Sequence, residues 1–364
     1  MISVNTALII AKYAFGASVA ATTLAAGGLW YFQRALIYPS YVPDGSRKIV
    51  PKPIEIGCPY EDVSLTCPDG VKVRAYVIPA RIKPLSAQEI RSMGTEERKE
   101  RASKEMEIWA EEMGNEKATE YAQSRPTVVF FHANAGNMGH RLPLARKFNV
   151  DFGCNIFMLS YRGYGLSEGR PSELGIRTDI ETAMKYIQAH PILGSTKIVL
   201  YGQSLGGAAC LYAGSKHKDS VSGLILENTF LSLRTLIPLI LPQIPKVLLP
   251  ILLTEHWDAH KTMTLIPATT PILFLAGRQD ELVKPSQMIA LRHLRDGGRT
   301  RWREFDGGHN DTCLVPGYWE EIGQWLKEEI EDDDGSWGKG SESEKDEGYT
   351  EVTHEDAMET KKDL

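Results

Sequence analysis

The sequence predicts an α/β protein with a mostly parallel central sheet and helices on both faces. Strands buried on both faces lose polar alternation and become short, continuous apolar runs. Such runs recur after residue 126, at residues 127–132, 155–161, 197–202, 221–228 and 271–276. Segments with helical spacing, such as residues 173–190, separate them. Strands that alternate with helices in this way form a doubly wound sheet with right-handed crossovers.

Composition is that of a globular protein with an acidic tail. Of 364 residues, 42% are apolar and 24% are charged. The net charge of −6 is uneven, because residues 331–364 carry thirteen acidic and four basic side chains, which leaves about +3 for residues 1–330. We expect this tail to be disordered, since it lacks the apolar content to fold. Nucleic-acid binding is not expected, because no basic stripe is interleaved with aromatic residues.

The amino terminus predicts a membrane anchor over residues 1–36. Residues 13–32 carry no charge and are bounded by Lys12 and Arg34. About 20 apolar residues suffice to cross a hydrocarbon core of roughly 30 Å. The cluster LWYF at residues 29–32 lies where an interfacial aromatic belt is expected. A cleaved signal peptide and a helix lying on the membrane surface are the alternatives.

Charges on the two sides of the span predict its orientation. Before the span lie Lys12 and the amino group, and after it lie Arg34, Arg47, Lys48 and Lys52. The slight excess after the span favours a cytosolic location for the domain that follows it. We therefore expect a single-pass protein of the endoplasmic reticulum or plasma membrane.

The five cysteines predict free thiols. Their spacing matches no metal site, and an odd count does not fit a complete disulfide framework. A single bridge between Cys58 and Cys67 stays open if the domain is luminal. The cysteines are Cys58, Cys67, Cys154, Cys210 and Cys313.

The remaining chain, residues 37–330, is predicted to form one α/β domain. After an irregular linker, residues 61–67 and 71–79 flank an Asp69-Gly70 turn and predict a hairpin. Residues 80–125 are dense in charge and predict a surface insertion, helical or partly disordered, without a catalytic role.

Residues 230–270 break the alternation of strands and helices and predict a small cap. This segment is apolar but contains four prolines, so broken helices fit it better than a second membrane span. Plain core packing and membrane contact through an exposed apolar face are the alternatives. The prolines are Pro238, Pro242, Pro245 and Pro250.

Ser204 is the candidate nucleophile. It lies in Gly-Gln-Ser-Leu-Gly, directly after the apolar run KIVLYG and before a helical segment. In such a nucleophile elbow the serine occupies a strained strand-to-helix turn, and the flanking glycines allow close backbone approach. The five-residue pattern also occurs by chance. The prediction therefore depends on its position between a strand and a helix and on the acid and the base that follow in the sequence.

Asp280 and His309 are the predicted partners of Ser204. Asp280 follows the apolar run PILFLAG, and His309 follows the strand-like residues 300–306. The order Ser, Asp, His is that of the α/β-hydrolase fold, in which the imidazole takes the serine proton and the carboxylate orients the imidazole. Glu281 is a possible substitute for Asp280.

The oxyanion hole of this fold uses the amide after the nucleophile and one from the loop after an earlier strand. The first is Leu205. For the second, in the loop HANAGN after residues 127–132, we place the donor at Asn134, with Ala133 the near alternative. In the same loop, His132 is interpreted as a loop organiser rather than a second base.

The sequence resembles the fungal bud-emergence (Bem-type) α/β-hydrolases, whose animal counterpart is α/β-hydrolase domain-containing protein thirteen. The resemblance covers about residues 36–330. It implies the same triad, an amino-terminal membrane anchor and a serine-peptidase-like clan, without settling a substrate. The segments that carry it are HANAGNMGHR at residues 132–141, YRGYGLSEG at residues 161–169, GQSLGG at residues 202–207 and GGHND at residues 307–311.

Two positions depart from the family pattern. Ala133 stands where the family usually has glycine, so a positive φ there would strain the backbone and misalign the amide. Gln203 stands where a basic residue is common. In YRGYG, Arg162 is interpreted as a structural salt bridge rather than a cleft residue.

These observations predict a serine hydrolase that cleaves an ester or thioester, with a lipid-like or S-acylated substrate and no metal or cofactor. Within enzymes, peptide hydrolysis is the alternative. From another class, a catalytically weak scaffold in cell polarity is the alternative, and Ala133 is the feature that keeps it open.

Overall fold

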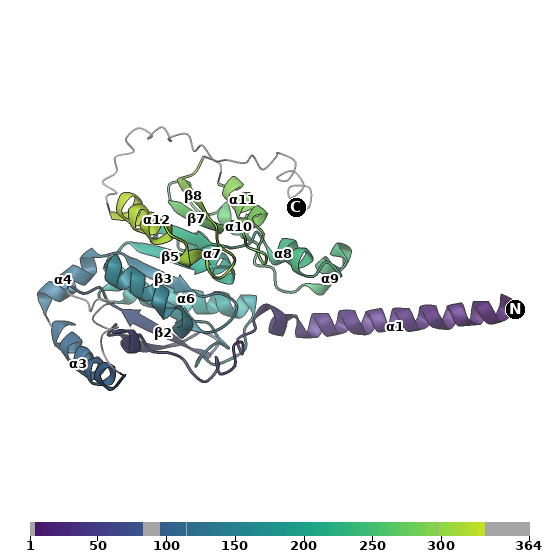
Figure 1. Ribbon diagram of the computed structural model, residues 1–364, viewed down its shortest axis with the longest axis horizontal. Helices are drawn as coiled ribbons and strands as arrows, with labels where there is room; N and C mark the ends of the chain where they lie inside the picture. The colour runs from purple at the N-terminus through teal and green to yellow at the C-terminus, as the bar shows by residue number, and fades with distance from the viewer. Residues whose placement is uncertain (1–3, 83–94, 114, 296, 332–364) are drawn as a thin grey trace.

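A computed structural model describes residues 4–82, 95–113, 115–295 and 297–331. Its centre is one eight-stranded sheet with strand order β1-β2-β4-β3-β5-β6-β7-β8 (Figure 1). β1 and β2 form an antiparallel hairpin, β2 pairs antiparallel with β4, and all other neighbours are parallel. The prediction of an α/β-hydrolase fold is confirmed.

The strands fall within two residues of the apolar runs that predicted them. They are β1 (Glu61–Thr66), β2 (Lys72–Ile78), β3 (Thr127–Phe131), β4 (Asn155–Ser160), β5 (Ile198–Gln203), β6 (Val221–Glu227), β7 (Ile272–Gly277) and β8 (Thr300–Phe305). Gly70 has a φ of 82° in the turn between β1 and β2, a conformation that glycine adopts without a Cβ penalty.

Alternate residues of strands β2 to β7 enter separate cores on the two faces of the sheet. In β3, Val129 and Phe131 pack with α6 (Glu173–Ala189), α7 (Leu205–Lys216), α10 (Ala259–Met263) and α11 (Pro285–His293). Val128 and Phe130 pack on the other face with α5 (Leu142–Arg146) and α12 (Tyr318–Trp325). Burial on both faces explains why the inner strands β3 to β7 are mostly apolar.

Residues 230–270 form broken helices at one end of the sheet, as the prolines predict. They comprise α8 (Leu233–Ile240), α9 (Leu249–Leu252) and α10, with a short 3₁₀ turn, Lys246–Leu248, before α9. Pro238 lies inside α8. We keep the term cap for residues 230–270.

The chain begins with the long helix α1 (Val4–Ile37), which projects from the side of the body that carries α8 and α9 (Figure 1). Within it, Ile9–Ile37 is long and apolar enough to cross a membrane, with a mean hydropathy of 1.4. Only the carboxyl-terminal end of α1 contacts the body. Gln33 and Arg34, with Tyr38 just beyond the helix, contact the end of α9 and the residues after it.

The charged insertion, where described, contains α3 (Thr95–Met113) and α4 (Glu116–Ser124) at the opposite end of the body from α1 (Figure 1). It is not only a solvated surface, because Arg81 and Glu105 form a buried ion pair at 2.7 Å. The predicted disorder of the tail concerns residues 332–364, which lie outside the described residues. All five cysteines are buried free thiols, so the open possibility of a Cys58–Cys67 bridge is wrong for this structure.

Candidate active site

Ser204 occupies a strained turn between β5 and α7. Its φ and ψ are 55° and −119°, and it is one of three described non-glycine residues with a positive φ. The turn is tight because the neighbouring glycines leave no room for a side chain. A Cβ on Gly202 would lie 2.1 Å from the carbonyl oxygen of Gly206, and one on Gly206 would lie 1.9 Å from that of Phe131. This geometry matches the nucleophile elbow that the sequence predicts.

Asp280 and His309 meet after the carboxyl ends of β7 and β8. The Nδ1 atom of His309 lies 2.7 Å from Oδ2 of Asp280. The other carboxylate oxygen of Asp280 accepts the amide hydrogens of Leu282 and Val283, at 2.9 and 2.7 Å. Because a carboxylate only accepts, His309 donates through Nδ1, which leaves Nε2 as the basic nitrogen.

The His309 loop is fastened to the Ser204 elbow by two amides. Gln203, the residue before Ser204, donates its Nε2 to the carbonyl oxygen of His309 at 2.7 Å. Asn228, after β6, donates to the same oxygen at 3.2 Å and to Oγ1 of Thr312 at 2.9 Å. The histidine loop and the elbow are therefore held as one unit.

Asn228 and Gln203 have roles in the site that the sequence did not predict. Asn228 has a φ of 44°, and its Oδ1 accepts the amide hydrogen of Gly277 at 2.7 Å. An asparagine directly after a buried strand was the available signal, because asparagine tolerates this conformation. The sequence marks Gln203 only as a departure from the family pattern, whereas in the structure its amide contacts the histidine loop.

The predicted oxyanion-hole residues lie beside Ser204. Leu205 is the first residue of α7, so its amide has no intrahelical acceptor. Asn134 lines the same cavity as Ser204. Ala133 does not have a positive φ, so the backbone strain considered for it does not arise.

The carbonyl groups around Ala133 and Asn134 are all fixed by hydrogen bonds. The hydroxyl of Tyr161 donates to the carbonyl oxygen of His132 at 3.1 Å, and that of Tyr164 donates to Asn134 at 2.7 Å. Nδ1 of His132 lies 2.8 Å from the carbonyl oxygen of Ala133. Since a trans peptide directs its N–H away from its C=O, these contacts also fix the amides of Ala133 and Asn134.

His132 fills the role of loop organiser that the sequence suggested for it. The ring is buried and stacks on Tyr161 with centroids 4.1 Å apart. Burial lowers the pKa of His132 to about 3. The imidazole is therefore neutral, with its proton on Nδ1, and its buried Nε2 has no hydrogen-bond partner among the described residues.

Comparison with known proteins identifies the family of this chain. A family described as alpha/beta hydrolase fold matches residues 126–249. Protein bem46 of Schizosaccharomyces pombe is 39% identical over 320 residues, which cover 88% of this chain and 94% of that protein. The chain belongs to the Bem-type family of α/β-hydrolases.

Other matches agree with this assignment. An uncharacterized membrane protein of Saccharomyces cerevisiae is 35% identical over 88% of this chain and 97% of its own length. Among solved structures, an esterase from Pyrococcus furiosus covers 77% of this chain and 95% of its own, with a TM-score of 0.56 and 17% identity. The likeness to that esterase shows a shared fold.

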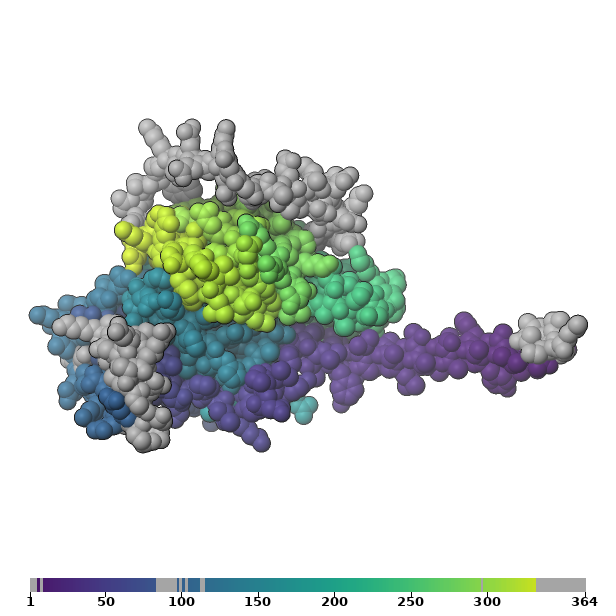
Figure 2. Space-filling view, in the orientation of Figure 1, coloured from purple at the N-terminus to yellow at the C-terminus, as the bar shows by residue number. Residues whose placement is uncertain are grey.

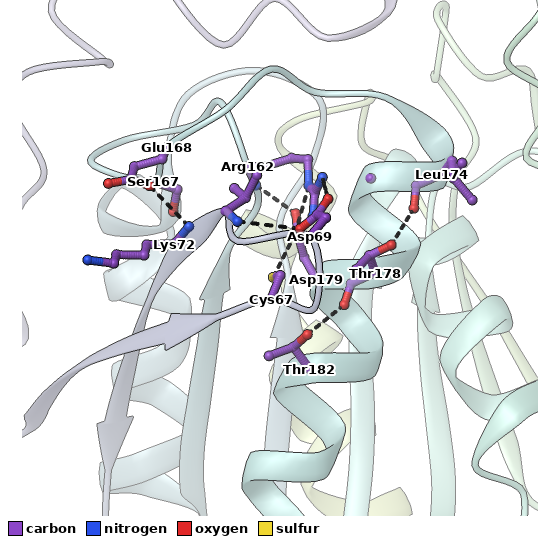
Figure 3. Close-up of polar contacts among 12 residues, drawn as sticks. Cys67, Asp69, Lys72, Arg162, Ser167, Glu168, Leu174, Thr178, Asp179 and Thr182 are labelled. Atoms are coloured by element: carbon purple, nitrogen blue, oxygen red, sulfur yellow. Dashed lines mark hydrogen bonds and ion pairs between the residues drawn. The ribbon is translucent and has the colours of Figure 1, made fainter.

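Arg162 of this Bem-type protein is a structural residue, as the sequence analysis favoured. Its backbone amide and its Nε both donate to Asp179 at 2.8 Å, and its guanidinium also contacts Asp69 (Figure 3). Cys67 contacts the same Asp179 carboxylate at 3.3 Å. The cluster joins α6, the hairpin turn and the loop after β4, and thereby fixes the loop that carries Tyr164.

Ser204 of this Bem-type protein lines an apolar cavity of about 330 Å³. Three of the nineteen lining residues are polar, namely Gln33, Asn134 and Ser204. The apolar walls come from the cap, from the loop after Asp280 and from the end of α1. Sequence analysis predicted the cap but not the contribution of α1. The cavity can hold an apolar group next to the hydroxyl of Ser204.

Proposed function

We propose that this Bem-type protein is a membrane-anchored serine hydrolase that cleaves an ester or thioester of an acyl chain. The observation that carries the proposal is the position of Ser204 in a strained elbow that opens into an apolar cavity. A hydroxyl in such a turn is exposed to a bound carbonyl group, and the apolar walls suit a hydrocarbon chain.

The proposed mechanism follows from the His309–Asp280 contact. His309 takes the proton of the Ser204 hydroxyl as its oxygen attacks the carbonyl carbon. The alcohol or thiol leaves with that proton, and an acyl-enzyme remains on Ser204. His309 then deprotonates water, which attacks the acyl-enzyme, and it returns this proton to the Ser204 oxygen as the carboxylic acid is released. The imidazolium formed in each step is stabilised by Asp280, whose carboxylate is 2.7 Å away.

In this mechanism the tetrahedral intermediate is stabilised by backbone amides. We assign this role to Leu205 and Asn134, with Ala133 as the neighbouring alternative. Loss of one such donor typically costs about 3 kcal/mol of transition-state stabilisation. The hydrogen bonds to the carbonyl groups of residues 132–134 support the assignment, because they keep these amides in place before substrate binds.

Membrane anchoring through α1 is supported by its length and hydropathy and by its aromatic cluster. Trp30, Tyr31 and Phe32 are exposed at the end of α1 nearest the body, where an interfacial belt is expected. For topology and compartment we retain a single-pass protein of the endoplasmic reticulum or plasma membrane, with a cytosolic catalytic domain.

The test is labelling of the full-length protein with a short-chain fluorophosphonate, followed by a panel of acyl esters and acyl thioesters. Wild type should be labelled and should hydrolyse members of the panel, whereas Ser204→Ala should do neither. A matched control is Ser215→Ala, on the same helix. A wild type as unreactive as Ser204→Ala would contradict the proposal and favour a scaffold. Cleavage of peptides alone would favour a peptidase.

A further inference from the structure

The end of α1 forms one wall of the cavity that contains Ser204. Leu29, Gln33, Leu36 and Ile37 line it together with α8 and α9. Their spacing of four, three and one residues places them on one face of the helix. Tyr31 and Phe32, on other faces, are exposed. The helix that is long and apolar enough to cross a membrane therefore also lines the cavity that contains Ser204.

A buried amide fastens this part of α1 to the cap. Gln33 is only 9% exposed, although it lies within the apolar segment Ile9–Ile37. Its Nε2 donates to the carbonyl oxygen of Leu252 at 3.1 Å, and its Oε1 accepts the amide hydrogen of Thr254 at 2.8 Å. A polar residue inside an apolar span is costly unless it is paired, so both hydrogen bonds favour this one position of α1.

An acidic residue fastens the helix just beyond Gln33. Arg34 and Tyr38 both donate to the buried carboxylate of Glu255, at 2.7 and 2.6 Å. Trp257 donates to the Tyr38 hydroxyl at 2.9 Å. Because Gln33, Arg34 and Tyr38 follow one another within two turns, the end of α1 is held against the cap over the length of the cavity wall.

The cap carries exposed apolar side chains outside the cavity. Val247 and Ile251, on the 3₁₀ turn and on α9, are 77% and 75% exposed, and neither lines the cavity. Figure 2 shows the cap lying directly against α1 where the helix leaves the body. A bilayer around α1 would therefore meet an apolar surface at the cap. The occupant that fits this continuity is a membrane amphiphile, with one acyl chain in the cavity.

We propose that the last turns of α1, residues 29–37, are a wall of the acyl-chain site, so that the anchor helix selects the substrate and the chain enters from the bilayer. This inference rests on the proposed function and specifies its substrate site. Each methylene that the cavity buries should raise kcat/KM by about fourfold, until the chain exceeds the cavity. A larger residue at Leu29 should shorten the chain that fits.

The experiment uses the full chain in phosphatidylcholine nanodiscs with p-nitrophenyl esters from two to sixteen carbons. Leu29→Trp should lose tenfold or more in kcat/KM on the longest esters that wild type accepts. Its loss on the acetyl ester and in short-chain fluorophosphonate labelling should be smaller than its loss on the long esters. Leu24→Trp is the matched control, because Leu24 lies on α1 but is 77% exposed and does not line the cavity. It should match wild type at every length.

Leu29→Ala provides the opposite change, since it enlarges the cavity and should move the preferred chain to greater length. A chain-length profile that is unchanged in Leu29→Trp and Leu29→Ala would overturn the inference. An equal loss in Leu24→Trp would also overturn it, because the effect would then arise from the membrane rather than from the cavity.

A readout without catalysis separates this inference from the proposed function. A diazirine-bearing palmitic acid should crosslink to the α8 segment in wild type and in Leu24→Trp, and less in Leu29→Trp. If Ser204 is unreactive but this pattern holds, the hydrolase proposal fails and the acyl site stands. If Ser204 reacts and the crosslinks do not depend on Leu29, the acyl site fails and the hydrolase stands.

Discussion

The catalytic rim and the acyl wall of this protein are held in different ways. We use catalytic rim for Ser204, Asp280 and His309 with their loops, and acyl wall for residues 29–37 with the cap. The rim is fixed by hydrogen bonds among loops that follow neighbouring strands. The acyl wall is fixed by contacts between segments more than 200 residues apart in the chain.

This difference implies a division of labour. The loops of the rim follow strands of the sheet, and in the proposed reaction they position groups that act in the same way on every acyl chain. The acyl wall joins α1 to the cap, so under the proposal its geometry sets which chain fits. Changes in the rim should therefore lower turnover for all substrates equally, and changes in the acyl wall should alter the preference among them.

The largest expected effect is that of Asp280→Asn, which removes the carboxylate that orients His309. We expect kcat to fall by about 10⁴ at every chain length, because the amide stabilises the wrong tautomer. The measurement is steady-state hydrolysis of short and long p-nitrophenyl esters. Asp306→Asn, on an exposed side chain nearby, is the control. A loss confined to long esters would contradict the proposed division of roles between the catalytic rim and the acyl wall.

Gln203→Met should lower kcat by about 10- to 100-fold, because displacement of a catalytic group by a small distance is costly. The substitution keeps the length of the side chain but removes the donor to the His309 carbonyl oxygen. KM should change little at any chain length. Gln188→Met, on the exposed surface of α6, should leave kcat unchanged. If the Gln203 variant raised KM and left kcat intact, Gln203 would belong with substrate binding instead.

His132 should make stability depend on pH through the oxyanion loop. Its pKa of about 3 lies below the ordinary histidine value of 6.5, so folding favours the neutral form. This contribution is complete above about pH 6.5 and is lost as pH falls towards 3. Between pH 7 and pH 5 the loss is about 2 kcal/mol.

The comparison is with His132→Gln, measured by thermal unfolding in detergent between pH 7 and pH 5. The advantage of wild type should shrink as the pH falls. If the difference in Tm between the two proteins stayed constant over this range, the imidazole would not be held neutral by the fold.

Gln33→Leu should have the smallest effect. It tests whether a change in the acyl wall affects long esters selectively. The change removes both hydrogen bonds to the cap, so we expect about a tenfold loss of kcat/KM on long esters. Activity on the acetyl ester should persist. Gln324→Leu, on an exposed helix surface, is the control. Equal losses on acetyl and long esters would place Gln33 with the rim.

The fold was predictable from the sequence, which also indicated the residues that we propose for the rim. Strands buried on both faces, such as residues 127–131, are almost entirely apolar and can be recognised without knowledge of their neighbours. The elbow at Ser204 depends on glycines within two residues of it, so its geometry is local. Asp280 and His309 follow from the order of side chains after successive strands.

The remainder of the site depends on partners that no local pattern identifies. Gln203 and Asn228 donate hydrogen bonds to the carbonyl oxygen of His309. Every residue has such a carbonyl group, so the sequence does not indicate which one is the acceptor. Gln33 reads as one polar residue at the end of an apolar helix, and its partners are the backbone of Leu252 and Thr254. The strain considered at Ala133 was a question of backbone angle, which residue identity alone did not determine.

The most direct test of the account is to trap the acyl-enzyme. The full-length protein is mixed with a medium-chain p-nitrophenyl ester, quenched in acid within the first turnover, digested and analysed by mass spectrometry. The account predicts that the peptide containing Ser204 gains the mass of the acyl group, and that Ser204→Ala gains none. Turnover of the same ester by Ser204→Ala at the wild-type rate, or an acyl group on a different residue, would contradict it.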